Sequence, residues 1–198
     1  MVDSLAQKPF EIFRGADALD YGEHPIQELV DPSPAVLNAF TGFSRYEESG
    51  SDVKLVYARA GCSLTSVWFK SGYPLALHSH TGGCLYYIVA GSIRIGEERL
   101  GPGDGFFVDH DVPYTYQTGP DGVEVLEFRS TNELDIRFKT NTKAAWDKII
   151  AKMGARQSAW SSEVRPSKKA QCQHAHRRPC SSAPTAAVKT RRKAGLRV

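Results

Sequence analysis

The sequence lacks any long apolar run. Of its 198 residues, 41% are hydrophobic and 24% are charged, yet no uninterrupted apolar stretch approaches the roughly 20 residues that span a bilayer. The opening residues, MVDSLAQKPFEIF, contain no basic head followed by an apolar stretch, so we expect no secretory signal. These absences exclude a membrane-spanning protein, and the composition fits one ordinary globular domain with appendages.

Several catalytic signatures are missing as well. The sequence contains no GxSxG, no GxxxxGK[ST], no GxGxxG after a strand and no HExxH, which argues against the hydrolases, nucleotide-binding enzymes and zinc proteases that carry them. Its four cysteines follow no disulfide framework. A reducing compartment fits that usage best, and we therefore expect a cytoplasmic protein.

The net charge of +3 hides two opposite parts. Residues 1–154 carry 14 basic and 21 acidic side chains, whereas residues 155–198 carry 11 basic side chains and one acid, Glu163. An acidic body with a basic tail does not indicate a nucleic-acid protein, and we expect neither nucleic acid nor membrane as a partner. The basic clusters of the tail, at 177–178 and 191–193, leave contact with nucleic acid or acidic surfaces open as the alternative to a solvated tail.

The middle of the chain has the pattern of short strands. Apolar and β-branched runs occur at 54–60, 63–70, 74–80, 84–91, 92–96, 105–110, 114–118 and 123–130, and 134–139 adds another. Glycine-rich turn signals separate them, including one at 119–122. Short strands at this spacing predict an all-β closed barrel or sandwich, with no helix between residues 54 and 140.

Helices are predicted only at the two flanks. Ser33 followed by Pro34 is a helix start, and residues 33–40 continue it. Later in the chain, residues 141–156 place four apolar side chains, Trp146, Ile149, Ile150 and Met153, on one helical face. The predicted organisation is an N-terminal arm (1–53) packed on a barrel (54–140), a C-terminal helix (141–156) and a disordered basic tail (157–198).

His78-Ser79-His80 is the first candidate for chemistry. In a strand, residues i and i+2 point to the same face, so both imidazoles project together, as a metal site needs. By itself the pair is a weak signal, because two histidines at this spacing are often surface residues. Glycines at 72, 82, 83 and 91 frame it with turns.

These residues resemble the first motif of the cupins, which runs Gly, five residues, His-x-His, three or four residues, Glu, six residues, Gly. Gly72, His78, His80 and Gly91 match, and Cys84 stands at the Glu position. The second motif matches at Gly103, while Tyr114 takes the third His position and Thr118 the Asn position. The resemblance covers about residues 54–130.

The resemblance implies a single antiparallel cupin β-barrel of jelly-roll type, with a site inside that holds a divalent metal. The implied ligands are His78, His80, Cys84 and Tyr114, and Tyr114 is also the implied catalytic hydrogen-bond donor. The metal is expected to be iron(II), with zinc as the alternative. Cys84 as a small packing residue, and Tyr114 as a core aromatic, remain the competing interpretations. His110 is a further, geometrically awkward candidate for the third histidine.

Two functions from different classes follow. The first is a dioxygenase-type oxidoreductase with one metal ion, acting on a small oxygenated or aromatic substrate; the stretch HSHTGGCLYYIVAGS also resembles cysteine dioxygenases locally. The second is a non-catalytic barrel that binds or senses a small molecule and has a degenerate metal site. Family habit implies a homodimer in either case.

Glu124 and Glu127 are not expected to form a catalytic pair. They are three residues apart on one predicted strand, so they face opposite ways. A solvated position is predicted for either, with one of them pointing into the barrel as the alternative.

Overall fold

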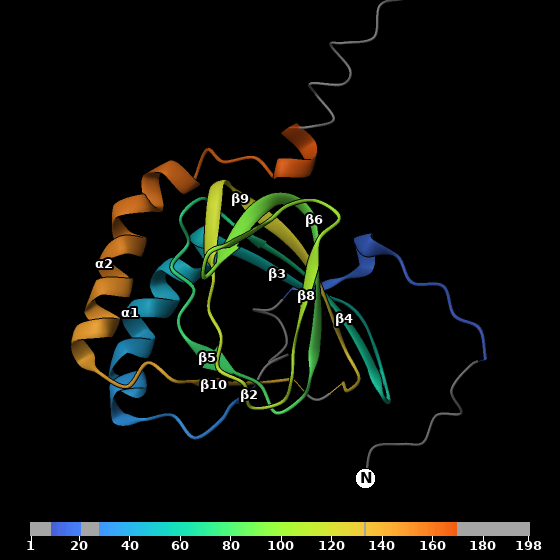
Figure 1. Cartoon of the computed structure of the whole chain (residues 1–198), viewed down its shortest axis with the longest axis horizontal. Coiled ribbons are helices and arrows are strands. Elements are labelled where there is room, and N and C mark those ends of the chain that lie inside the picture. Colours follow the sequence, from blue (N-terminus) through green and yellow to red (C-terminus); the bar gives the residue numbers. More distant parts are fainter. Residues whose placement is uncertain (1–8, 21–27, 133, 170–198) are drawn as a thin grey trace, which may run out of the picture.

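Strands make up most of the chain between two helical flanks. The computed structural model describes residues 9–20, 28–132 and 134–169. The larger sheet has the order β1-β3-β4-β9-β6-β7, with β8 also paired to β6, and the smaller sheet has the order β2-β10-β5 (Figure 1). The larger sheet comprises β1 (Leu19–Asp20), β3 (Ser51–Arg59), β4 (Cys62–Phe69), β6 (Cys84–Ile95), β7 (Glu98–Leu100), β8 (Gly105–Val108) and β9 (Gln117–Arg129). The smaller comprises β2 (Glu28–Leu29), β5 (His78–Ser79) and β10 (Asp135–Phe138).

The pairing confirms the all-β jelly-roll prediction with one qualification. All strand pairs are antiparallel except β10 with β2, which run parallel. The two sheets are not joined into one closed ring of hydrogen-bonded strands. No helix lies between residues 54 and 140 in the part of the chain described there, as predicted.

The long pair β6 and β9 forms the centre of the fold. Residues 84–90 of β6 alternate between buried and exposed, so Cys84, Tyr86 and Ile88 face the interior. The runs predicted separately at 84–91 and 92–96 form this one strand. The turn predicted at 119–122 is wrong, because those residues continue β9.

Glycine explains why that turn signal sits inside a strand. Gly91 and Gly122 both have positive φ, 78° and 77°. They lie beside each other in the β6–β9 pair, where Gly91 is opposite Val123. A Cβ on Gly91 would lie 2.2 Å from the carbonyl oxygen of Gly122. The register of β6 on β9 shifts beside Gly91. The glycines therefore allow a bulge and a close approach rather than a reversal of the chain.

The two long helices lie side by side against the sheets (Figure 1). A short 3₁₀ turn, η1 (Gly15–Asp17), precedes them. Helix α1 (Pro34–Gly50) starts where predicted, with the Ser33 hydroxyl accepting from the Val36 amide at 3.4 Å, but it runs on to Gly50. Helix α2 (Lys143–Trp160) is capped by Thr142. None of the described helices is long and apolar enough to cross a bilayer.

The predicted end of the C-terminal helix, at residue 156, is wrong, and so is disorder for residues 157–169. Trp146, Met153 and Trp160 are spaced seven apart and all are buried on one face of α2. The Trp160 indole N–H donates to the Ser71 carbonyl at 2.9 Å, and Glu163 accepts from the Ser71 amide at 3.0 Å. Each of these groups finds its partner in the β4–β5 loop. The rest of the predicted tail, residues 170–198, lies outside the described residues.

Candidate metal site

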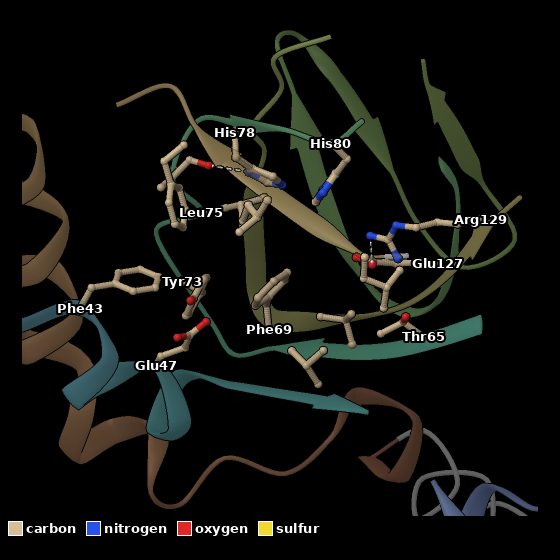
Figure 2. A pocket seen from close by; sticks show the side chains of 16 residues that line it. Phe43, Glu47, Thr65, Phe69, Tyr73, Leu75, His78, His80, Glu127 and Arg129 are labelled. Atoms are coloured by element: carbon tan, nitrogen blue, oxygen red, sulfur yellow. Dashed lines mark hydrogen bonds and ion pairs between the residues drawn. The ribbon is translucent and has the colours of Figure 1, made fainter. Parts of the chain in front are cut away.

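A small cavity of about 80 Å³ lies inside the fold between the two sheets and α1 (Figure 2). One end is mostly apolar and is lined by residues including Phe43, Phe69, Leu75 and Phe138, with the Glu47 carboxyl beside them (Figure 2). Burial raises the pKa of Glu47 to about 7. The other end is polar and is lined by Thr65, His80, Glu127 and Arg129. His78 also lines the cavity, so both predicted histidines face the interior.

Strand β5 fixes the two imidazoles. It pairs with β10, with His78 opposite Phe138 and Ser79 opposite Arg137. On its other side, His78 and Tyr114 exchange backbone hydrogen bonds of 2.9 and 3.2 Å. His78 and His80 are only 3% and 6% exposed. The two-residue period of a strand therefore brings both rings to one place, as the sequence predicted.

Backbone carbonyls set the tautomer of each ring. His78 Nδ1 lies 2.7 Å from the Ala76 carbonyl oxygen, and His80 Nδ1 contacts the Asp135 carbonyl oxygen. A carbonyl can only accept, so both Nδ1 atoms carry the proton and both Nε2 atoms present a lone pair. This is the arrangement that commonly orients histidine ligands in metal sites.

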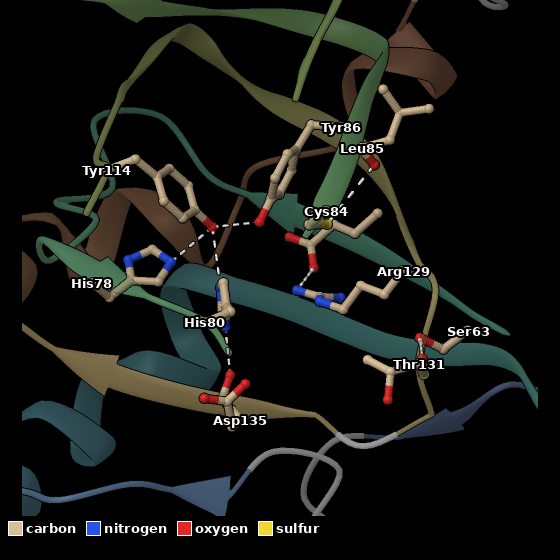
Figure 3. Close-up of polar contacts among 11 residues, drawn as sticks. Ser63, His78, His80, Cys84, Leu85, Tyr86, Tyr114, Arg129, Thr131 and Asp135 are labelled. Carbon is tan, nitrogen blue, oxygen red and sulfur yellow. Dashed lines mark hydrogen bonds and ion pairs between the residues drawn. The ribbon is translucent and has the colours of Figure 1, made fainter. Parts of the chain in front are cut away.

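The two lone pairs converge on one hydroxyl. Tyr114 Oη lies 2.8 Å from His78 Nε2 and 3.2 Å from His80 Nε2, and 2.6 Å from the hydroxyl of Tyr86. Figure 3 shows Tyr114 at the meeting point of these three contacts. The structure thus brings together His78, His80 and Tyr114 from the predicted ligand set.

The protons available do not satisfy this network. Three contacts meet at Tyr114 Oη, but two phenols supply only two protons. If Tyr86 donates to Tyr114, Tyr114 can donate to only one imidazole. The other buried Nε2 lone pair is then left with no proton to accept from this network. An unsatisfied acceptor in a buried site is costly, and a cation or a further donor would relieve it.

Burial keeps both rings neutral. It lowers the pKa of His78 to about 4, and the neighbouring His80 lowers it further. Burial also lowers the pKa of His80 to about 4, with Arg129 adding to the effect. Burial raises the pKa of the Tyr114 phenol well above its ordinary value. At neutral pH the site consists of two neutral imidazoles and a protonated phenol. The imidazoles can bind a cation as they are, and the phenol can bind one by losing its proton.

Cys84 lies beside this cluster, where its thiol interacts with Tyr86 and Arg129. Its side chain is fully buried, and burial raises the pKa of its thiol to about 11. It lies opposite Arg129 on β9 and Val108 on β8. Among the described residues, no three His, Cys, Asp or Glu side chains are grouped as one metal site. Its surroundings fit the packing interpretation. His110 is exposed and bonded to Asp109 at 2.8 Å, away from the cavity.

Sequence reasoning missed the other polar wall of the cavity. Glu127 and Arg129 form a buried ion pair of 2.7 Å, with side chains 11% and 6% exposed. Burial alone would lower the pKa of Arg129, but the Glu127 carboxylate beside it raises that pKa above its usual value. The strand period of residues 123–129 was the available signal, because it puts Val123, Val125 and both charged residues on one face.

The prediction that Glu124 and Glu127 are solvated is wrong for both, although they do face opposite sides. Glu127 points into the cavity and pairs with Arg129. Glu124 accepts from Arg165 at 3.2 Å and from the Ser167 amide at 2.7 Å on the outside of the sheet. In each case a donor makes burial of the carboxylate tolerable: Arg129, two residues along the same strand, for Glu127, and Arg165 with the Ser167 amide, distant in sequence, for Glu124.

Thr65 adds an unsatisfied donor to the same polar end. It is 2% exposed and stands directly opposite Glu127 in the β4–β9 register. Its Oγ1 has no hydrogen-bond partner among the described residues. Buried hydroxyls are normally bonded, so this one is available to a molecule in the cavity.

The residues present fit a divalent metal ion in part. Two neutral imidazole nitrogens and one phenol oxygen point to a common place, and imidazole suits Zn, Fe, Cu and Ni. Carbonyl partners on both Nδ1 atoms match the second shell of histidine ligands. The set departs from the cupin pattern, since it has two histidines and no carboxylate ligand.

Comparison with known proteins finds likeness of fold only. No family model and no curated protein matches the chain. KdgF from Halomonas sp. is 25% identical, with a TM-score of 0.36, over 41% of this chain and 79% of its own. An RmlC-like cupin from Shewanella frigidimarina is 21% identical, with a TM-score of 0.38, over 42% of this chain and 78% of its own.

The polyketide cyclase RemF from Streptomyces resistomycificus is 14% identical, with a TM-score of 0.47, over 70% of this chain and 91% of its own. The His78-Ser79-His80 strand lies between two facing, mostly antiparallel sheets and points toward the interior, as the cupin resemblance implied.

Proposed function

We propose that the chain is a metal-binding cupin in which His78, His80 and Tyr114 hold one divalent ion. The observation that carries this proposal is the convergence of two imidazole lone pairs on one phenol oxygen, with one proton too few. A bound cation removes that deficit. Iron(II) is the ion we favour and zinc the alternative, because both accept imidazole and phenolate ligands. Cys84 is left out of the ligand set.

The metal would act as a Lewis acid toward an oxygen-bearing group of a small substrate. The chain's own residues would bind and orient that substrate. Thr65 offers a hydroxyl without a partner, and Arg129 and Glu127 offer a donor and an acceptor with no net charge. The opposite end of the cavity offers aromatic and aliphatic contact. This division favours a small neutral molecule with a polar head and an apolar body.

Oxidoreductase chemistry of the dioxygenase type is the finer proposal. The cavity beside the ligands has a volume of about 80 Å³ and an aromatic-lined end, which favours a small oxygenated substrate over a bulky aromatic one. Tyr114 is the residue placed to hold or release a proton at the metal-facing side of the cavity.

The second candidate is a small-molecule-binding barrel without catalysis. The Tyr114 hydroxyl favours this candidate. It already contacts both imidazoles and so partly satisfies their hydrogen-bonding needs without a metal. A compound that raises the melting temperature of metal-free protein as strongly as that of metal-loaded protein would favour this candidate.

Calorimetric titration of the chelator-treated chain tests the metal proposal. We expect one Zn²⁺ or Fe²⁺ per chain, with affinity lowered at least tenfold in His80→Ala, since each ligand contributes strongly to a three-residue site. His110→Ala is the matched control, because His110 is exposed and is not among the residues that line the cavity. The absence of binding, or an equal loss in both variants, would overturn the proposal.

A further inference from the structure

Glu47 is a carboxyl of the cavity wall that the proposed function leaves unused. It belongs to the last turn of α1 and lies beside Tyr73, at the opposite end of the cavity from Glu127 and Arg129 (Figure 2). Glu127 has a partner, because Arg129 donates to it at 2.7 Å. The Glu47 carboxyl makes no hydrogen bond or ion pair with any residue that the structure describes. Carboxyls inside a protein normally have donors around them, so this one is available to a molecule in the cavity.

The charge of Glu47 is not offset by its surroundings. Burial raises the pKa of Glu47 to about 7, and the neighbouring Glu48 adds to the effect. Burial also raises the pKa of the Tyr73 phenol well above its ordinary value, with the Glu47 carboxyl adding to it. Within the described chain, no basic side chain counters these effects at Glu47. A hydrogen-bond donor, and above all a cationic one, would therefore stabilise the ionised form.

The side chains around Glu47 suit a donor that is carried on a short apolar stem. Phe43 lies four residues before Glu47 on α1 and lines the same cavity. Phe69 stacks on Tyr73, with ring centroids 4.6 Å apart. Aromatic rings contact apolar carbons well and also attract ammonium groups. A bare metal ion would need several oxygen ligands instead, whereas this end of the wall is chiefly aromatic.

Glu47 also borders a groove on the surface of the protein. Glu47 and Val53 line both the cavity and this groove, which has a volume of about 560 Å³. Three further carboxyls line the groove, those of Asp20, Glu48 and Asp52. A molecule in the groove therefore lies next to the same carboxyl that faces the cavity.

The groove keeps an excess of negative charge near Glu47. Lys54 pairs with Asp20 at 2.6 Å, and Arg165 pairs with Asp52. Lys70 is the basic residue on the groove wall, and its ammonium group donates to the Trp160 carbonyl at 2.9 Å. Neither Glu47 nor Glu48 has a basic partner among the described residues. Anions approaching Glu47 from this side are repelled.

We propose that Glu47 determines which molecules the cavity accepts: the substrate presents an amine or a hydroxyl to Glu47 and carries no carboxylate. This rests on the proposed function, which places the oxygen-bearing head of the substrate at the other end of the cavity.

The polar end of the cavity agrees with this substrate class. Thr65 is 2% exposed there, and its hydroxyl has no hydrogen-bond partner among the described residues. Glu127 already neutralises Arg129, so that end favours an uncharged head. Considered without Glu47, the cavity favours a neutral molecule. With Glu47 included, it favours one whose far end is a hydrogen-bond donor, with an ammonium group preferred to a hydroxyl and a hydroxyl to a carboxylate.

Binding of propylamine, 1-propanol and propionate, which share one carbon chain and differ in the end group, tests the proposal. Ligand-observed NMR titrations would be run at pH 8, where Glu47 is mostly ionised. In the wild type we expect propylamine to bind about tenfold or more tightly than propionate, with propanol between them. In Glu47→Gln the ratio of amine to carboxylate affinity is expected to fall to about two or less.

Glu48→Gln is the matched control, because Glu48 neighbours Glu47 on α1 and lines the groove but not the cavity. The wild-type ratio is expected to persist in it. Glu47→Leu is a second uncharged replacement, and circular dichroism checks the fold of each variant.

Equal affinities for amine and carboxylate in the wild type, or no binding of any of the three compounds, would overturn the proposal. A ratio that Glu47→Gln leaves unchanged, or that Glu48→Gln lowers equally, would overturn it as well. The preference does not require a metal, so it is expected in both chelator-treated and zinc-loaded protein. If it persists in a chain that binds no metal, the metal proposal fails and the role of Glu47 stands.

Discussion

At the scale of single residues, the candidate site depends on one hydroxyl. Tyr114 Oη contacts His78, His80 and Tyr86 at once. The two phenol protons available there determine which hydrogen-bond acceptors of this buried network are satisfied. The sequence could predict these residues because a two-residue period and a motif position each place one side chain. Local pattern alone could not predict that Tyr114 meets the two histidines, because the contact joins segments 34 and 36 residues apart. The cupin resemblance, which implied Tyr114 as a ligand beside both of them, did predict it.

The Tyr114→Phe variant isolates that hydroxyl. We expect metal affinity to fall about ten- to hundredfold, and the free energy of unfolding of metal-free protein to fall by about 1–3 kcal/mol, because two imidazole nitrogens and the Tyr86 hydroxyl lose their partner. Titration calorimetry and urea unfolding measure the two effects. Tyr116→Phe is the control, since Tyr116 lies in the same core but outside the network; equal effects in both variants would contradict the assignment.

The two histidines also predict how stability depends on pH. Their folded-state pKa values of about 4 lie below the ordinary histidine value of about 6.5. The unfolded chain therefore binds more protons between these values, so stability is fully present above pH 6.5 and is lost as the pH falls toward 4. The loss is on the order of 3 kcal/mol for one histidine.

Urea unfolding of chelator-treated protein at pH 7, 5.5 and 4.5 measures this loss. The fall should be smaller in His80→Gln than in the wild type, and unchanged in His110→Gln. If His80→Gln and the wild type lose stability in parallel, the histidines are not the source.

Charged residues were harder to place from the sequence. Lone carboxylates are normally solvated, and Glu124 and Glu127 were predicted to be so. Their burial depends on Arg165 and Arg129 respectively. Arg129 is two residues from Glu127 on the same strand face, so this pair was readable from the strand period, whereas Arg165 comes from a segment 41 residues away.

At the scale of elements, strands and helix starts were predictable and ends were not. Alternation marked β6, and Ser33-Pro34 marked α1, because both signals are local. The end of α2 depends on tertiary contact: Trp160 is held by Ser71 and packs on Tyr73, with ring centroids 5.9 Å apart. The seven-residue spacing of Trp146, Met153 and Trp160 was the local signal for the longer helix, and the contact with Ser71 and Tyr73 was not readable from it.

Trp160→Ala therefore tests whether the end of α2 is part of the folded body. Removing a fully buried tryptophan is expected to lower the free energy of unfolding by about 3–5 kcal/mol. Val164→Ala, at a side chain 48% exposed just beyond the helix, should change it by less than about 1 kcal/mol. Thermal or urea unfolding measures both. Equal, small effects would restore the prediction that the chain beyond residue 156 is dispensable.

At the scale of the whole molecule, two cores meet around the cavity. One packs α1 and α2 onto the sheets through Phe43 and Trp146, and the other covers the inner face of β6 and β9 with side chains such as Tyr86 and Ile88. His78 and His80 lie where these cores approach each other. The cavity beside them is lined by residues that pack in these cores, including Phe43 and Phe69. A cofactor bound there would be enclosed by the buried side chains of these two cores.

Metal content of the purified chain is the measurement that tests the account most directly. The protein would be expressed without added metal, dialysed without chelator, and analysed by elemental mass spectrometry beside a His78→Ala, His80→Ala double variant. We expect about one iron or zinc per wild-type chain and none in the double variant, with the same circular dichroism spectrum for both. Trace metal in a correctly folded wild type, or stoichiometric metal that the double variant retains, would contradict the claim that these histidines form a metal site.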